Sequence, residues 1–291
     1  MDNKIIAIAT IAIIVIAGVG AYMMLGNGGS GSNSSAHAIT YDGVEPTEDN
    51  VMNGTYSIQR NLVLVTKGEP TGNVKCLLDW ITSSEGQGIL GKEFVKLGET
   101  EFTDYTAPDR NGKTEIVCGG STSINETMSR LAEAYMEKYP YISIKINGGG
   151  SGVGEKNTDS GVFDIGMLSR DMSPSYNGNL IPVNIGRDGV AVIANIEGVE
   201  GLTSQQVADI FSGKITNWSE VGGPDKRIGV VIREDGSGTR DCFDTTMGVV
   251  ESGWKVTDNC ITQNSTGNVI MSVQTIEGAI GYISIGQLGV L

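Results

Sequence analysis

Histidine is almost absent from this chain, and cysteine and aromatic residues are scarce. The 291 residues include one histidine, His37, and four cysteines, and 6% of them are aromatic. A single histidine excludes Ser-His-Asp and Cys-His catalysis and histidine-rich metal sites. No two cysteines lie close in sequence, which argues against a cysteine metal site. We therefore expect a protein that is not an enzyme and that needs no metal or cofactor.

Positive charge is also in short supply. Lysine and arginine together number 20 against 34 aspartates and glutamates, so the net charge is −14 at pH 7. This charge opposes binding to nucleic acid or to an anionic lipid surface. A closed pocket lined with donors can still hold an anion, because physiological salt screens charges more than roughly 8 Å away.

The one long apolar run lies near the N-terminus. Residues 5–25 carry no charge and are long enough to span a bilayer. No cleavage site or lipid-anchor cysteine accompanies them, so residues 1–25 are predicted to be an uncleaved transmembrane signal anchor. Residues 26–38 are rich in glycine and serine, which is typical of a flexible linker. The folded part would then lie outside the cytoplasm, where Cys242 and Cys260 could form a disulfide.

Two glycine-rich loops stand between a β-prone run and a helix start in the middle of the chain. Residues 119–123 (Gly-Gly-Ser-Thr-Ser) follow the strand-like residues 114–118 and precede residues 125–138, whose apolar side chains recur at helical spacing. The second loop, residues 147–154, holds five glycines and Ser151. Glycine allows the backbone to approach a ligand closely, although a flexible turn is the simpler reading of this loop.

A third loop of the same kind follows later. Residues 233–239 (Arg-Glu-Asp-Gly-Ser-Gly-Thr) lie between an apolar run, residues 228–232, and a predicted helix. Free N–H groups and the helix dipole attract an anion to a helix N-terminus. Arg233 can offer a planar fork to a tetrahedral anion, with Asp235 placed to orient it. A serine or threonine before a single helix is more often a plain cap, so the prediction rests on the loops together.

A fourth segment, residues 163–171, reads as a strand that delivers Ser169 and Arg170 at its end. With these loops in place, residues 114–291 resemble the first two thirds of the phosphate-binding proteins that feed phosphate ABC transporters. The resemblance rests on Gly120-Ser121-Thr122-Ser123, Gly150-Ser151-Gly152, Asp164-Ile165-Gly166 with Ser169-Arg170, residues 202–218, residues 233–239 and Gly278-Ala279-Ile280-Gly281-Tyr282. It implies an α/β fold of the two-lobe periplasmic-binding-protein type II, with the ligand cleft between the lobes.

The remaining family segment comes first in this chain. Residues 42–47, 53–65 and 74–92 look like the family's C-terminal part, so the segment order resembles a circular permutation joined within residues 86–113. We then expect lobe I at residues 39–185 and lobe II at residues 186–291. Residues 56–65 should pack beside residues 188–195 as the second hinge strand. Exchange of parts between two copies is the alternative, because changes near a hinge favour swapping.

The resemblance also implies the ligand-binding residues. They are predicted to be Ser121, Thr122, Ser123, Ser151, Ser169, Arg170, Arg233, Asp235, Ser237, Gly238 and Thr239. In relatives, a carboxylate at the position of Arg170 accepts the proton of hydrogen phosphate. Here Arg170 either leaves that role to another acceptor, such as Asp171, or points away and pairs with a surface acid. Trp218 and Tyr282 are expected to pack in the core.

The predicted function is that of an extracytoplasmic solute-binding protein, anchored in the cell membrane, that captures inorganic phosphate and delivers it to an ABC transporter permease. A monomer is the expected state. The alternative is a membrane-anchored binder or sensor of another oxyanion, such as sulfate, molybdate or tungstate, without a transporter. A phosphatase on the same pocket is disfavoured, since the chain lacks a histidine base and an acidic metal cluster.

Overall fold

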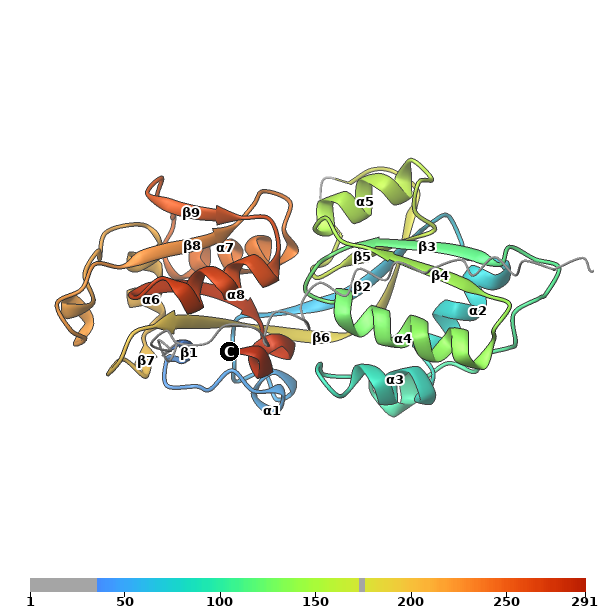
Figure 1. Cartoon of the computed structure of the whole chain (residues 1–291), viewed down its shortest axis with the longest axis horizontal. Coiled ribbons are helices and arrows are strands. Elements are labelled where there is room, and N and C mark those ends of the chain that lie inside the picture. Colours follow the sequence, from blue (N-terminus) through green and yellow to red (C-terminus); the bar gives the residue numbers. More distant parts are fainter. Residues whose placement is uncertain (1–35, 173–175) are drawn as a thin grey trace, which may run out of the picture. The chain divides into compact units, whose positions relative to one another are not determined.

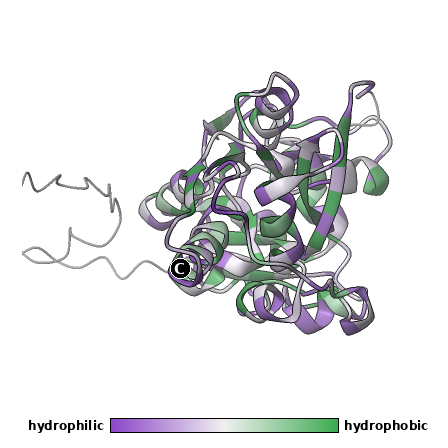
Figure 2. Cartoon of the chain, turned by 90° about the vertical axis from the view of Figure 1, so that its right-hand side faces the viewer, coloured by the Kyte–Doolittle hydropathy of each residue, from purple (hydrophilic) through white to green (hydrophobic). Residues whose placement is uncertain are grey.

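The computed structural model describes residues 36–172 and 176–291, in which two lobes share a pair of crossing strands (Figure 1). The strands follow the order β4-β3-β5-β2-β6-β10-β8-β9, with β1 beside β6 and β7 beside β1. In Figure 2, hydrophobic and hydrophilic residues alternate along the helices and strands, as expected for elements that bury one face. This is the two-lobe α/β fold that the sequence predicts.

Lobe I has one large core between its strands and helices. Its elements are β2 (Gln59–Lys67), α2 (Gly72–Ile81), α3 (Ser84–Leu90), η1 (Glu99–Glu101), β3 (Glu115–Gly120), α4 (Asn125–Lys138), β4 (Ser143–Asn147), α5 (Ser151–Asp159), β5 (Ile165–Leu168) and the first half of β6 (Leu180–Asn195). The α4 helix has the predicted bounds and buries Met128, Leu131 and Tyr135 on one face. Tyr135 packs edge-on against Trp80 of α2, with ring centroids 5.2 Å apart.

Lobe II contains the second half of β6 and the elements at both ends of the described chain. They are β1 (Ala36–Tyr41), α1 (Glu48–Met52), β7 (Gly201–Leu202), α6 (Ser204–Phe211), η2 (Trp218–Val221), β8 (Gly229–Arg233), α7 (Gly238–Val250), β9 (Cys260–Gln263), α8 (Thr266–Thr275), β10 (Ala279–Ser284) and η3 (Ile285–Val290). Trp218 and Tyr282 are buried here, as predicted. Tyr282 stacks on Phe243, with centroids 4.2 Å apart.

The strands β2 and β6 connect the lobes. They pair antiparallel from Gln59↔Gly189 to Lys67↔Leu180, with a register shift at Leu62/Val63. Residues 59–65 pair with β6, but their partners are residues 182–189, which overlap the predicted stretch of residues 188–195 only at Asp188 and Gly189. Beside the shift, Gly186 has φ +154, and a Cβ there would lie 2.7 Å from the Val95 carbonyl oxygen. Only glycine fits this position.

The start predicted for lobe I is wrong for residues 39–58. Ile39, Val51 and Tyr56 lie in the same core as Trp218 and Phe243 of lobe II. The cause is strand pairing, because β1 lies antiparallel to the second half of β6, from Ala36↔Asn195 to Ile39↔Val192. From residue 36 on, the chain therefore runs first through lobe II, crosses to lobe I along β2 and returns along β6.

The anchor predicted for residues 1–25 lies outside the described residues, as does most of the predicted linker. Residues 36–38, at the end of that linker, are part of β1 instead. In the part of the chain that the structure describes, no helix combines the length and the apolar character needed to cross a membrane.

Candidate functional site

The loop after β3 brings three of the predicted residues to one end of the lobe I strands. Ser121 and Ser123 are buried and Thr122 is half-buried. The Ser121 amide donates to the Met167 carbonyl at 2.7 Å, which ties the loop to the end of β5. Gly120 makes this approach possible, since it has φ +141 and a Cβ there would lie 3.0 Å from the Gly154 Cα.

Ser151 and Ser169 join the same cluster from α5 and from the end of β5. The Ser121 hydroxyl donates to the Ser169 Oγ at 2.8 Å. The Ser169 amide donates to the Ser151 Oγ at 3.1 Å. All three side chains are at most 1% exposed. Lobe I therefore presents a buried group of hydroxyls, as the loop sequences predict.

The loop between β8 and α7 supplies the lobe II side. Arg233 is 1% exposed, and Ser237, Gly238 and Thr239 are buried with it. The Ser237 hydroxyl accepts from the Arg240 amide and so caps α7. Arg233 Nη1 donates to the Thr266 Oγ1 at 3.1 Å, at the start of α8. Two helix N-termini and one guanidinium thus meet at this point.

Asp235 does not orient Arg233, so that prediction is wrong. The Asp235 side chain is 96% exposed and pairs with Arg240, with Oδ1 2.7 Å from Nη1. Glu234 holds Arg233 instead, through two bonds of 2.8 Å to Nε and Nη2. The reason is local: Asp235 lies at the tip of the turn, next to Gly236 with φ +83, and so faces solvent.

The two halves of the cluster touch across the lobes. The Ser123 Oγ and the Thr239 Oγ1 share a hydrogen bond of 2.8 Å, and the Gly152 amide donates to the Gly236 carbonyl at 2.9 Å. Thr122 and Thr266 make a weaker contact of 3.4 Å. Residues far apart in sequence are thus brought to one site by the meeting of the lobes.

Arg170 lies beside this hydroxyl cluster and is bound by two acids. Its Nη1 and Nη2 donate to the Glu155 carboxylate at 3.0 and 2.7 Å. Its Nε lies 2.8 Å from the Asp241 Oδ2 of lobe II. Of the two possibilities open for Arg170, pairing with an acid is the observed one. Asp171 accepts instead from the Asn61 side-chain amide at 2.8 Å.

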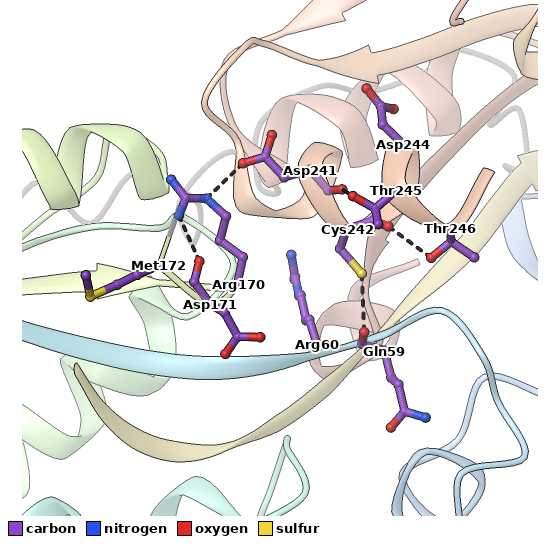
Figure 3. Close-up of a pocket in the computed structure, with 10 residues that line it drawn as sticks. All are labelled: Gln59, Arg60, Arg170, Asp171, Met172, Asp241, Cys242, Asp244, Thr245 and Thr246. Carbon is purple, nitrogen blue, oxygen red and sulfur yellow. Dashed lines mark hydrogen bonds and ion pairs between the residues drawn. The ribbon is translucent and has the colours of Figure 1, made fainter. Parts of the chain in front are cut away.

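A cavity of about 620 Å³ borders Arg170 on the side of the crossing strands (Figure 3). In Figure 3, Arg60 points up from β2 between Arg170 and Cys242. The lining residues are Gln59, Arg60, Arg170, Asp171, Met172, Asp241, Cys242, Asp244, Thr245 and Thr246. Burial raises the pKa of the Asp241 carboxyl, and Arg170 opposes that rise.

Four further residues of the site were not predicted from the sequence. They are Arg60 and Asp188 on the crossing strands, Glu234 beside Arg233, and Thr266 at the start of α8. Arg60 and Asp188 form an ion pair of 2.7 Å with side chains 2% and 0% exposed. The available signal was a charged residue just before an apolar run in each strand, Arg60 before residues 62–65 and Asp188 before residues 190–194, because charges are rarely buried unless they are paired.

Cys242 and Cys260, for which the sequence left a disulfide open, are both free thiols in this structure. The Cys242 Sγ faces the Gln59 carbonyl at 3.5 Å on the crossing strand, whereas Cys260 lies in β9. Burial raises the pKa of the Cys242 thiol to about 11. In residues 36–172 and 176–291, no group of three or more histidine, cysteine or acidic side chains is placed to hold a metal ion.

Two α/β lobes that meet at a buried group of hydroxyls, two helix N-termini and Arg233 form the architecture of a solute-binding protein of the two-lobe type. A family model described as the PBP superfamily domain matches residues 106–289. The chain belongs to this superfamily.

Individual relatives agree with the family match. The phosphate-binding protein PstS 2 of Streptococcus pneumoniae is 34% identical over 188 residues, which is 64% of each chain. The solved phosphate-binding protein of a phosphate ABC transporter from the same organism matches with a TM-score of 0.55 at 31% identity, over 64% of this chain and 72% of that one. A Clostridium perfringens structure solved with bound phosphate is 41% identical, with a TM-score of 0.51, over 58% and 70%. This chain spans slightly less than two thirds of the length of the curated relative.

Proposed function

We propose that this protein captures inorganic phosphate in the cleft between its lobes and delivers it to an ABC transporter. One observation carries the proposal: hydroxyls from lobe I and Arg233 with the α7 N-terminus from lobe II converge on one buried site. The names of the relatives, which describe phosphate-binding proteins, support phosphate as the anion. A bound ligand would favour the closed state, since it can contact both lobes at once only in that state.

The proposed roles follow from the contacts. On binding, five lobe I hydroxyls that now bond to other protein groups would donate to the phosphate oxygens instead. They belong to Ser121, Thr122, Ser123, Ser151 and Ser169. Ser237, Gly238 and Thr239 would offer the hydroxyls and amides of the α7 N-terminus. Arg233 would supply a charge-assisted bond while Glu234 holds its far edge. Arg170 and Asp235 are bound by other side chains, so we assign them to the rim.

Another oxyanion is the second candidate, and Arg170 is the reason. Hydrogen phosphate carries a proton that fully ionised sulfate lacks, so selection against sulfate requires an acceptor in the site. The carboxylates of Glu155 and Asp241 are near but are engaged by Arg170. A pocket of donors alone would suit sulfate, molybdate or tungstate equally well.

We also propose that the lobes of this chain are held outside the cytoplasm by an N-terminal anchor at residues 1–25, and that the protein is a monomer. The apolar run and the glycine-rich residues that follow it support this arrangement. We propose further that it has no phosphatase activity. The test is incubation of the purified chain with a phosphate monoester, with no phosphate release expected.

The segment order is proposed to be a circular permutation of the family order. The family match starts at residue 106, whereas β2, which precedes it, is the central strand between β5 and β6. Ala36 and Leu291 pack against the same small hydrophobic cluster, which includes Ile193 and Val269. The two ends of the described chain therefore lie within reach of a short connection.

Calorimetric titration of the full chain in mild detergent, with phosphate and then sulfate between pH 5 and pH 8, tests the function. Phosphate binding without sulfate binding is expected, and would show that an acceptor exists in the site. Equal binding of both anions would favour the second candidate. Binding of neither anion, nor of molybdate or tungstate, would contradict both.

A further inference from the structure

We propose that Arg60 and Asp188 are a positioning pair for the anion site: they fix the direction of the Thr239 hydroxyl and thereby couple ligand contact to the crossing strands. The inference rests on the proposed function, because Thr239 is taken as one of its ligand groups. Neither residue belongs to the glycine-rich loops.

The pair sits where both crossing strands pass between the lobes. Arg60 in β2 and Asp188 in β6 face each other in register. Arg60 Nε and Nη2 donate to the Asp188 Oδ2 at 3.0 and 2.7 Å. The other carboxylate oxygen, Oδ1, accepts from the Ser284 hydroxyl of β10 at 2.9 Å. The carboxylate is therefore satisfied on both sides, and two edges of the guanidinium are fixed.

The remaining edge of Arg60 points to the anion site. Its Nη1 donates to the Thr239 Oγ1 at 2.8 Å. An arginine has only donors, so Thr239 must accept this bond. The Thr239 proton then points away from Arg60, and the Ser123 Oγ of lobe I, 2.8 Å away, is placed to accept it. A bound anion would compete for that same proton.

This arrangement joins the lobes and the hinge in one chain of bonds. It runs from Ser123 in lobe I through Thr239 in lobe II to Arg60 and Asp188 on the crossing strands, and every member is buried. Closure brings Ser123 to Thr239, and Arg60 keeps the Thr239 hydroxyl pointed toward it. A loose hydroxyl would lose entropy at each binding event, whereas this one is oriented beforehand.

Strand pairing alone does not require the pair. The backbone ladder between β2 and β6 already joins these strands. A buried ion pair often contributes little net stability compared with apolar side chains of the same size, because both charges lose their water. What separates this pair from a simple structural one is its third bond, to a ligand group.

A double-mutant cycle on phosphate affinity tests the proposal. Arg60→Lys keeps the charge but cannot reach Asp188 and Thr239 with a fork, and Thr239→Val removes the accepting hydroxyl. Ser284→Ala is the matched control, since it removes a bond to Asp188 in the same buried network without touching Thr239. We expect Arg60→Lys to weaken phosphate binding about tenfold and Ser284→Ala by less than about twofold, the losses of a charge-assisted and a remote bond.

The decisive result is the double variant. If Arg60 acts through Thr239, the variant with Arg60→Lys and Thr239→Val should bind phosphate no more weakly than Thr239→Val alone. The proposal would be overturned if the double variant lost phosphate affinity by the product of the two single losses. Equal losses of affinity in Arg60→Lys and Ser284→Ala would also overturn it.

A second readout needs no ligand. The Gly152 amide is bonded across the lobes to the Gly236 carbonyl, so its hydrogen exchange reports closure in the free protein. Arg60→Lys should speed exchange at Gly152 while leaving the β2 amides of Val63 and Val65 unchanged. Equal acceleration at all three would mean that Arg60 serves only the fold. This result stands even if the protein binds no phosphate, so the two proposals fail separately.

Discussion

Gly238 of lobe II packs directly against Ser151 of lobe I. A Cβ built on Gly238 would lie 2.8 Å from the Ser169 Oγ and closer still to the Ser151 Oγ. The first residue of α7 is therefore a point where the two lobes meet with no room for a methyl group. A side chain at this residue would force the two lobes apart at this contact.

The first prediction is that Gly238→Ala weakens phosphate binding. The added methyl group would hold the lobes apart, at a cost of about 1 to 3 kcal/mol for overpacking, which is roughly 5- to 150-fold in affinity. Calorimetry measures the affinity. Gly248→Ala is the control, because Gly248 lies in the same helix with nothing within 4 Å of its Cβ position. Equal affinities of the two variants would show that the lobes do not close at Gly238.

The second prediction ranks three polar residues. Arg233→Ala should cost about 2 to 5 kcal/mol of binding free energy, because a buried charge is removed and Glu234 loses its partner. Ser151→Ala should cost about 1 kcal/mol, the value of one neutral hydrogen bond. Asp235→Asn should change binding by less than about 0.5 kcal/mol, since its side chain faces solvent. Titrations of the three variants would contradict the assignment if Asp235→Asn proved as harmful as Arg233→Ala.

The third prediction concerns pH and Asp244 in α7. Burial raises the pKa of the Asp244 carboxyl above its ordinary value of 3.8, and Arg240 opposes the rise. The protonated form thus favours folding, so this contribution is complete below pH 3.8 and is lost as the pH rises through the higher folded-state pKa. Asp244→Asn should therefore gain stability relative to the wild type as the pH rises. Urea unfolding at several pH values measures the difference.

Glu85 provides the opposite case. Hydrogen bonds from Lys138 and Tyr105 lower the pKa of its carboxyl below the ordinary value of 4.5. The stabilising contribution is present above pH 4.5 and is lost as the pH falls through the lowered pKa. Glu85→Gln should therefore be less stable than the wild type at neutral pH and approach it in acid. The two variants should therefore show opposite trends with pH in their stability relative to the wild type. If Asp244→Asn and Glu85→Gln followed the same trend, the causes assigned to the two pKa shifts would be wrong.

The fourth prediction tests the segment order. Joining Leu291 to Ala36 by a short glycine-rich linker, and opening the chain near residue 106, should restore the family order without changing the fold. The phosphate affinity should match that of a control chain that lacks residues 1–35. A chain that keeps only residues 106–291 should fail to fold, because it lacks β2 from the middle of the sheet. Circular dichroism and calorimetry distinguish these outcomes.

Much of the site could be predicted from local sequence. The loops at Ser121, Ser151 and Ser237 each combine glycine with a small hydroxyl residue before a helix, and this pattern depends only on neighbouring residues. The helix at Asn125–Lys138 was equally clear, because its apolar residues repeat with a helical period. The acid that pairs with Arg233 could not be predicted, since Glu234 and Asp235 both follow it closely in sequence. Only the shape of the turn decides which of the two carboxylates faces Arg233.

The sequence by itself determined the three hydroxyl-bearing loops and the strands and helices beside them, because periodicity, glycine and capping residues act over a few neighbouring positions. The tertiary structure alone decided that β1 joins lobe II, that Arg170 binds Glu155 and Asp241, and that Arg60 reaches Thr239. These contacts join residues that the chain separates widely, apart from Arg170 with Glu155. Their geometry arises only when strand pairing and core packing bring the segments together.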